Sequence, residues 1–552
     1  MTHATPRTLI KGGRLITAVD DYVADLIVEG ERIACIGHAL EVGPDTHVID
    51  ASGLLVFPGG VDCHTHMENT FGTSTTCDNF ASGTRSAAFG GTTTIVDFAL
   101  QTPGTSPLEA IARAGAKASS AANIDYGFHV IVTQVDEQVL ADMRDAIRHE
   151  GVSSFKMFMA YPGTVMSDDA AIFQAMRMVG QHGGMIALHA ENGTVIDLLI
   201  REAIAQGHTS PRYHALTRPA IMEGEATHRG IKLAELAEAP VYFVHLSAKE
   251  ALKHVIEARD LGIPVFAETC PHYLFFDESV YADDNFDLAR YVMSPPLRSK
   301  EAQHALWTAL RTDDLQLIST DHCPYCMKEG HRGNFNQKPL GASDFSKIPN
   351  GVPGVETRMT VVYDGGVRDG KISLNRFVEL MSTAPAKLFG LFPRKGTLAI
   401  GSDADIVLFD PDERHTISAR TQHSDCDFTL FEGRQVTGRV KKVMLRGQWL
   451  VDDDEWVGPT GRGRFVARAS SARSDDHDMP MYEYACPGCG VFDARRMVSE
   501  RDIPACCPRC GQYAPRVRLT LPSIYRSNHD ASHEGDDGAY LKSRLDCACC
   551  RS

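Results

Sequence analysis

Long apolar runs are missing from this 552-residue chain. No run reaches the roughly 18 apolar residues that a membrane-spanning helix needs, and residues 1–11 lack the apolar stretch of a secretory signal peptide. Basic residues are outnumbered, because 55 Lys and Arg stand against 71 Asp and Glu, for a net charge of −16. That balance disfavours nucleic-acid binding by the main body. We expect a soluble, cytoplasmic globular protein without a membrane partner.

The fifteen cysteines are numerous for such a protein. Without an export signal they are expected to be reduced thiols or metal ligands rather than a disulfide framework. The length allows two or three domains, and no solenoid-type repeat is present.

Both flanks of the main body have the pattern of short strands. Residues 9–16 and 24–30, and again 401–409 and 442–447, are apolar stretches bounded by turn residues. We expect residues 1–57 and 396–466 to pack together as one small β-sandwich domain.

Residues 58–395 have a different pattern, in which apolar runs alternate with helical segments. The runs 93–98, 185–189 and 241–245 are almost continuously apolar, as buried parallel strands are. A helix is expected over about 225–237, with Ile231, Leu233 and Leu236 facing the core. This alternation predicts an α/β fold with a parallel sheet, and the polar residues at its strand ends favour a (β/α)8 TIM-like barrel.

Six residues at the ends of five expected strands have the chemistry of a two-metal site. His64 and His66 are alternate residues of one strand, so both imidazoles face one side and can bind one ion. A lone buried histidine is usually only a satisfied polar group, and a buried lysine often reaches a carboxylate. Together, however, the six favour a metal centre: His64, His66, Lys156, His189, His245 and Asp321.

Several motifs resemble the dihydropyrimidinase/hydantoinase family of the amidohydrolase superfamily, over about residues 8–466. They are His-Thr-His at 64–66, Lys-Met-Phe-Met-Ala-Tyr at 156–161, His-Ala-Glu-Asn at 189–192, His-Leu-Ser at 245–247, Met-Ser-Pro-Pro-Leu-Arg at 293–298, Thr-Asp-His-Cys at 320–323 and Ile-Pro-Asn-Gly at 348–351. The resemblance implies a metal-dependent cyclic amidase that opens dihydropyrimidines or 5-substituted hydantoins to N-carbamoyl amino acids. It also implies a homotetramer.

The resemblance also implies roles for individual residues. Two zinc ions, or other divalent metals, are bridged by an N6-carboxylated Lys156; His64, His66 and Asp321 complete the more buried site, and His189 and His245 the other. Asp321 is the expected proton carrier and Tyr161 the oxyanion donor, although without the resemblance Tyr161 is an ordinary loop aromatic. Backbone groups of Ser294 and Asn350 are expected to hold the imide edge of the ring.

Two other functions stay open. One is hydrolysis of another cyclic imide or ureide, as in allantoinase-like chains, although those usually continue Glu-Pro-Gly where this chain does not. The other is a non-catalytic scaffold, although such relatives lack some of the six ligands. A dihydroorotase-like activity is disfavoured, because those chains bind the substrate carboxylate with an arginine at the position of Glu68, which is expected to repel a carboxylate.

The C-terminal segment has the pattern of a zinc ribbon. Two Cys-Pro-x-Cys-Gly knuckles, about 17 residues apart, are expected to bind one structural zinc through Cys486, Cys489, Cys507 and Cys510. A pair of redox-active Cys-x-x-Cys motifs is the alternative.

The segment at 479–484 resembles the start of small regulatory zinc ribbons of the FmdB type. The expected organisation is a linker at 467–478, a ribbon at 479–522 and a disordered tail at 523–552. Nucleic-acid contact by the ribbon stays open, and the tail cysteines Cys547, Cys549 and Cys550 have no assigned role.

Overall fold

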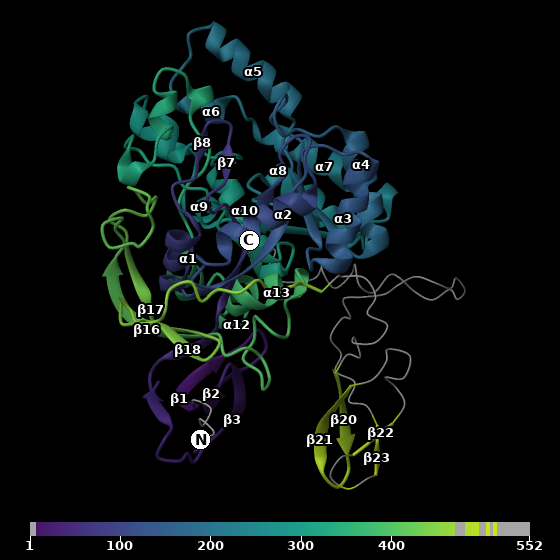
Figure 1. Cartoon of the computed structure of the whole chain (residues 1–552), viewed down its shortest axis with the longest axis vertical. Helices are drawn as coiled ribbons and strands as arrows, with labels where there is room; N and C mark the ends of the chain where they lie inside the picture. Colours follow the sequence, from purple (N-terminus) through teal and green to yellow (C-terminus); the bar gives the residue numbers. More distant parts are fainter. Residues whose placement is uncertain (1–6, 470–480, 496–503, 508–509, 511, 516–552) are drawn as a thin grey trace, which may run out of the picture. The chain divides into compact units, whose positions relative to one another are not determined.

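A computed structural model describes residues 7–469, 481–495, 504–507, 510 and 512–515 (Figure 1). The chain divides into two compact units, Met1–Arg473 and Ser474–Ser552. The start of the predicted FmdB-like segment, most of the predicted linker and the whole predicted tail lie outside the described residues.

A nine-stranded sheet of the first unit combines strands from both flanks. Its order is β19-β18-β17-β16-β5-β1-β2-β3, with β4 paired to β1. The junction is β5, which runs antiparallel to β16 and parallel to β1. The strands are β1 (Arg7–Ile16), β2 (Asp21–Glu29), β3 (Arg32–Gly37), β4 (His47–Asp50), β5 (Leu55–Pro58), β16 (Ile406–Thr416), β17 (Gln435–Leu445), β18 (Gln448–Asp452) and β19 (Glu455–Trp456). One sheet therefore joins strands of the two flanks, and the boundaries of the β-sandwich domain stay a prediction.

Eight parallel strands form the barrel between these flanks. Their order is β15-β14-β13-β12-β11-β10-β9-β6. They are β6 (Gly60–Thr65), β9 (Thr92–Leu100), β10 (Asp125–Ile131), β11 (Ser154–Phe158), β12 (Met185–His189), β13 (Val241–Phe243), β14 (Val265–Thr269) and β15 (Leu317–Ile318). The ends of this order meet where His322 N donates to His64 O at 3.3 Å and His66 N donates to His322 O at 2.9 Å. The predicted α/β barrel is confirmed.

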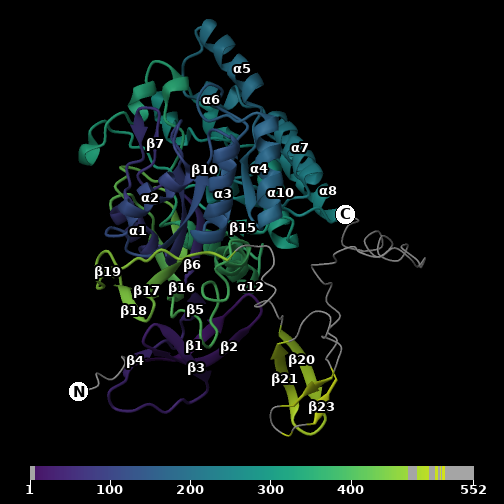
Figure 2. The ribbon, with the colours of Figure 1, turned by 45° about the vertical axis from the view of Figure 1, so that its right-hand side comes forward.

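Helices lie outside the barrel strands (Figure 2). They are α1 (Phe80–Phe89), α2 (Pro107–Ala118), α3 (Glu137–His149), α4 (Asp169–His182), α5 (Gly193–Ala205), α6 (Arg212–Leu216), α7 (Ala220–Ala237), α8 (Lys249–Asp260), α9 (Pro271–Phe275), α10 (Lys300–Thr312), α11 (Arg358–Val362), α12 (Leu374–Val378) and α13 (Ala384–Leu388). Local sequence sets their ends: the Asp168 side chain accepts from Ala171 N to begin α4, and Gly183 ends it at φ 72°.

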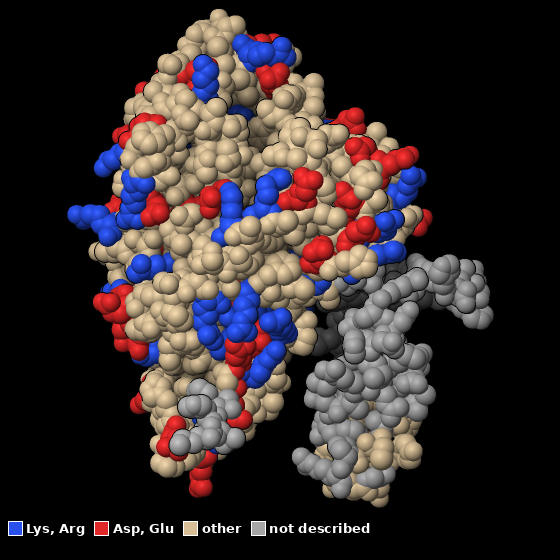
Figure 3. All heavy atoms as spheres, viewed as in Figure 1, with Lys and Arg blue, Asp and Glu red and all other residues tan. Residues whose placement is uncertain are grey.

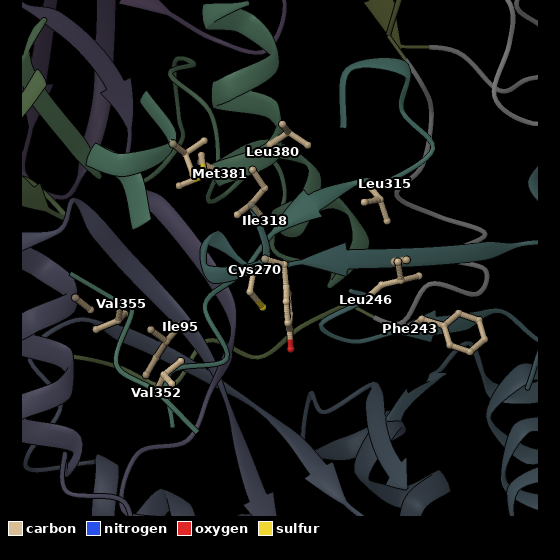
Figure 4. Close-up of a cluster of buried hydrophobic side chains, with 14 of the residues drawn as sticks. Ile95, Phe243, Leu246, Cys270, Leu315, Ile318, Val352, Val355, Leu380 and Met381 are labelled. Atoms are coloured by element: carbon tan, nitrogen blue, oxygen red, sulfur yellow. The ribbon is translucent and has the colours of Figure 1, made fainter. Parts of the chain in front are cut away.

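The main hydrophobic core fills the space between strands and helices. Ile318 of β15 lies beside Leu380 and Met381 in Figure 4, and all three are fully buried. Burying one such side chain is worth about 1.5–3 kcal/mol. The core-facing prediction for α7 holds for Ile231 but is wrong for Leu236, which is 72% exposed.

The surface of the described residues carries both signs of charge. On the face drawn in Figure 3, basic and acidic side chains are interspersed. No helix among the described residues is both long enough and apolar enough to cross a membrane.

Candidate functional site

The six predicted ligands lie at the carboxyl ends of the barrel strands. His64 belongs to β6 and His66 follows it; Lys156 belongs to β11 and His189 ends β12. His245 and Asp321 come shortly after β13 and β15. All six side chains are buried, at 9% relative exposure or less. Five different strands thus deliver six polar groups to one end of the barrel, where TIM-barrel active sites form.

Side-chain atoms of four of these residues lie close together, with His64 near the centre. Its Nε2 lies 3.1 Å from Lys156 Nζ and 3.0 Å from Asp321 Oδ1. The same carboxylate oxygen lies 3.4 Å from His66 Nε2. Burial acts to raise the pKa of the Asp321 carboxyl. The charge of His64 and the hydrogen bonds from His64 and His66 outweigh burial and hold that pKa well below its ordinary value.

The remaining two histidines form a second pair beside the first group. His189 Nδ1 lies 3.0 Å from His245 Nε2. The His245 ring in turn lies 5.4 Å from the His64 ring, centroid to centroid. Ligand atoms of His64, His245 and Asp321 all lie within 4.8 Å of one another. The structure therefore brings all six predicted residues into one continuous cluster.

Two buried carboxylates that the sequence analysis missed hold the outer nitrogens of two histidines. Glu268, on β14, contacts Nδ1 of His64, and Glu191 Oε2 lies 2.8 Å from Nε2 of His189. An ionised carboxylate only accepts hydrogen bonds, so each outer nitrogen carries a proton. The inner nitrogen is then the one that can lose its proton and offer a lone pair to a metal ion. This is the arrangement of metal-binding histidines, whose second N–H donates to a carboxylate.

Lys156 has no carboxylate as an ion-pair partner in the described part of the chain. Its Nζ lies 4.5 Å and 4.9 Å from the ring centroids of Phe98 and Phe158. The side chain is 2% exposed, and burial lowers its pKa. The alternative of a lysine that reaches a carboxylate therefore has no support here. Because burial disfavours the charged ammonium, this amine among imidazoles fits a ligand precursor better than a structural cation.

The cluster opens into a cavity of about 470 Å³. Tyr161, Ser294 and Asn350 lie together in its wall: Asn350 Nδ2 donates to Ser294 Oγ at 3.1 Å and to Tyr161 Oη at 3.4 Å. Burial raises the pKa of the Tyr161 phenol, which stays a donor. Apolar side chains line much of the remaining wall, beside several threonines and serines and Lys347; they include Phe71, Leu100, Phe158, Val165, Leu340 and Ile348.

The loop that follows His66 places its residues differently from what the sequence suggested. Glu68 lies outside the cavity lining and pairs with Lys117 at 3.2 Å. The Asn69 side chain turns inward and donates to Asp97 Oδ1 at 3.3 Å. Glu68 is therefore poorly placed to repel a substrate carboxylate, and residues from Thr70 to Ser74 line the cavity instead.

Three predicted site residues adopt backbone conformations that side chains rarely accept. Tyr161, His245 and Asp321 have φ values of 67°, 40° and 46°. Non-glycine residues at positive φ are uncommon and concentrate at functional sites. Each of the three occurs just after a strand, where this turn aims the side chain across the barrel mouth.

The second unit contains a separate group of cysteines. Strand β20 (Met481–Cys486) pairs with β21 (Gly490–Arg495), and β22 (Ala505–Cys506) pairs with β23 (Tyr513–Ala514), both antiparallel. Sulfur atoms of all four predicted ligands lie within 4.8 Å of one another: Cys486, Cys489, Cys507 and Cys510. Four thiols at this separation have the composition of a closed structural zinc site.

Comparison with known proteins points to one family. The model of the Amidohydrolase family matches residues 55–450. The D-hydantoinase of Streptomyces coelicolor is 50% identical over 468 residues, which cover 84% of this chain and 98% of that protein. The D-hydantoinase of Geobacillus stearothermophilus is 47% identical over 461 residues, covering 84% and 96%. The crystal structure of dihydropyrimidinase from Brevibacillus agri NCHU1002 superposes with a TM-score of 0.82 at 47% identity, over 85% of this chain and 100% of that one.

Proposed function

The chain belongs to the amidohydrolase family, and from that premise we propose that it opens 5-substituted hydantoins and dihydropyrimidines to N-carbamoyl amino acids. It is a hydrolase that acts on cyclic amides, as its D-hydantoinase relatives are. The main support for these ring substrates is the cluster of six buried predicted ligands at the mouth of a cavity whose wall is largely apolar. Because two of the relatives named above are D-hydantoinases, we propose a preference for the D enantiomer.

Two divalent cations fit the donor set, with zinc as the first candidate. His64, His66 and Asp321 would hold one ion and His189 and His245 the other, since imidazole and oxygen ligands suit zinc. Bound ions of this kind lower the pKa of water and polarise carbonyl oxygens. Glu268 and Glu191 support this set because they hold the outer nitrogens of His64 and His189, so the inner nitrogens are the ones directed toward an ion.

Lys156 is proposed to join both sets as a carbamate. In its unprotonated form Nζ attacks the carbon of carbon dioxide: a nitrogen–carbon bond forms, one carbon–oxygen π bond breaks with its electron pair going to oxygen, and one proton leaves the nitrogen. The product is an anion with two oxygens. The burial of Lys156 among imidazoles and phenyl rings, with no ion-pair partner in the described ranges, supports this modification.

The remaining residues are proposed to move protons and orient the ring. Asp321 Oδ1 lies between His64 and His66, where it can take the proton of the attacking water and return it to the leaving nitrogen. The Tyr161 hydroxyl faces the cavity and donates to the developing oxyanion. Ser294 and Asn350 hold the ring edge beside it, and their mutual hydrogen bond fixes that wall.

Two further proposals concern assembly and the second unit. We propose a homotetramer, as the family resemblance implies, which light scattering of the purified protein tests. For the second unit we propose one structural zinc bound by its four clustered cysteines, in a ribbon of the FmdB type. All six residues of the ligand cluster belong to the first unit.

The test is turnover by zinc-loaded protein with two ions per barrel. Values of kcat/KM are compared for dihydrouracil and for the D and L enantiomers of a 5-substituted hydantoin. Faster turnover of the D-hydantoin than of its L enantiomer supports the proposal. Failure to open any of the three rings overturns the substrate proposal and favours another cyclic amide.

A further inference from the structure

Three buried cysteines from distant parts of the chain lie together outside the six-ligand cluster. Cys77 comes between β8 (Ser74–Thr75) and α1, Cys326 follows β15, and Cys426 lies between β16 and β17. Their sulfur atoms all lie within 4.8 Å of one another. None of the three has a part in the mechanism proposed above.

The backbone around each cysteine is fixed by hydrogen bonds. Cys77 N donates to Pro324 O at 2.9 Å, which ties the first segment to the second. Cys326 N donates to Gln337 Oε1 at 2.8 Å. On the third segment, Cys426 N donates to Ser424 Oγ at 3.1 Å. The three thiols are therefore held in place before any ligand binds, which lowers the entropic cost of binding one.

The electrostatics of the trio favour one shared negative charge. Hydrogen bonds from Cys426 and Cys77 lower the pKa of the Cys326 thiol to about 4, and burial raises the pKa of Cys426. One thiolate with two thiols carries a charge of −1. A divalent ion that binds all three cysteines as thiolates displaces the two remaining protons, so the net charge of the site stays at −1. A monovalent ion bound in the same way would leave a net charge of −2 in a buried site.

We propose that Cys77, Cys326 and Cys426 bind a structural zinc ion that is separate from the barrel site and from the cysteines of the second unit. Thiolates select thiophilic ions such as zinc over magnesium or calcium. Zinc in structural sites takes four ligands. We assign the fourth position to His331, which follows Cys326 by five residues and whose charge acts on the Cys326 thiol. His331 is not among the ligand atoms that lie close together in this structure, so we propose that its side chain rotates to bring the ring to the ion.

Two of the three segments that such an ion would join border the cavity. The segment that ends at Cys77 begins with the cavity-lining residues Thr70–Ser74, and Cys323 and Tyr325 line the cavity just before Cys326. Gln337, which accepts from Cys326 N, also donates to Thr75 O at 3.1 Å. The ion would therefore stabilise the wall of the mouth without contacting substrate.

The direct test uses crystals of the wild-type chain grown with zinc, and needs no variant. Anomalous scattering at the zinc edge is expected to give a peak about 2.3 Å from all three sulfurs. Crystals with zinc in the barrel but no peak among these sulfurs would overturn the proposal. Continuous density between two of the sulfurs, a disulfide, would overturn it too. Because barrel occupancy is read separately, failure here is distinguishable from failure of the cyclic-amidase proposal.

A second test counts ions in the full chain by mass spectrometry of metal content. Cys426→Ser is expected to bind one zinc fewer than wild type and to melt at a lower temperature, with the barrel and second-unit zinc retained. Cys35→Ser, at a half-buried cysteine far from the trio in sequence, is the matched control and keeps the full count. Equal zinc content in wild type and Cys426→Ser overturns the site. A His331→Ala variant that keeps wild-type zinc affinity overturns the assignment of the fourth ligand.

Discussion

The carboxylate of Glu268 contacts the outer nitrogen of His64, and both side chains are completely buried. Glu268 also accepts from His245 N at 3.0 Å and from the hydroxyl of Tyr242. One carboxylate thus sets the orientation of His64 and the backbone position of His245, although it occupies no ligand position itself.

Removing this carboxylate should weaken metal binding. In Glu268→Ala the His64 ring loses the acceptor that fixes its tautomer, and such changes typically cost about 10-fold to 100-fold in metal affinity. Competition with a chelator measures the affinity of the barrel site. Glu257→Ala, at an exposed glutamate on α8, is the control and should match wild type. An unchanged affinity in Glu268→Ala would show that His64 is oriented by other contacts.

Replacing Lys156 should empty the barrel of metal. Without the carbamate, both proposed ion sites lose a shared ligand, so Lys156→Ala should lose both ions and activity. A short carboxylic acid added to the buffer should restore part of each, because it supplies two oxygens in the vacated space. Lys253→Ala, at an exposed lysine on α8, should retain both ions. Two ions still bound to Lys156→Ala would rule out the bridging role.

The hydroxyl of Tyr161 should matter for the chemical step rather than for binding. An oxyanion donor is worth about 100-fold to 1000-fold in rate, so Tyr161→Phe should lower kcat by that factor with little change in KM. Tyr213→Phe, on α6, is the control for loss of a phenol elsewhere. A Tyr161→Phe enzyme with wild-type kcat would place the oxyanion donor on another group.

The zinc of the second unit should be dispensable for turnover. Cys489→Ser removes one of four clustered thiols, so zinc content should fall by one ion while kcat/KM stays at the wild-type value. Cys506→Ser, at the cysteine next to Cys507 but outside the group of four, should keep the full zinc content. A parallel loss of activity in Cys489→Ser would mean that the second unit contributes to catalysis.

The ligand cluster was predictable because its signals are local. Each ligand is a polar residue at the end of an apolar strand, and His64 and His66 share one strand face. Glu268 gave no such signal, since it is a single carboxylate between Ala267 and Thr269 and its partner is 204 positions away. The positive φ of Asp321 could not be predicted either, because the surrounding barrel imposes it.

The error on α7 has a packing cause. The buried face of this helix is built from small side chains, among them Ala226, Gly230 and Ala234. A Cβ added to Gly230 would lie 2.8 Å from Leu188, so the helix approaches the barrel too closely for a large residue. Periodicity of large apolar residues placed Leu236 inside, whereas close approach selected small residues and left Leu236 exposed.

Lys338 should give the stability of the first unit a pH dependence that a single substitution removes. Its ammonium group is buried and donates to Val292 O at 2.8 Å and to Pro349 O at 2.9 Å, next to Ser294 and Asn350. Burial lowers its pKa to about 7, against about 10.4 for lysine in an unfolded chain. Between these values the unfolded chain holds one more proton than the folded one. The free energy of unfolding therefore rises with pH across this window, and the contribution is lost as pH falls toward 7.

Chemical denaturation of wild type and Lys338→Met at several pH values between about 7 and 10 measures this effect. Wild type should gain stability over the window relative to Lys338→Met, because methionine binds no proton in either state. Subtracting the unfolding free energies of the two proteins removes the contributions of the cysteines and tyrosines that titrate in the same pH range. Lys232→Met, at an exposed lysine on α7, should follow wild type at every pH. Parallel curves for Lys338→Met and wild type would mean that Lys338 stays protonated when folded. Its two carbonyl partners would then stabilise the charge enough to offset the cost of burying it. A buried cation would in that case help to hold the cavity wall that contains Ser294 and Asn350.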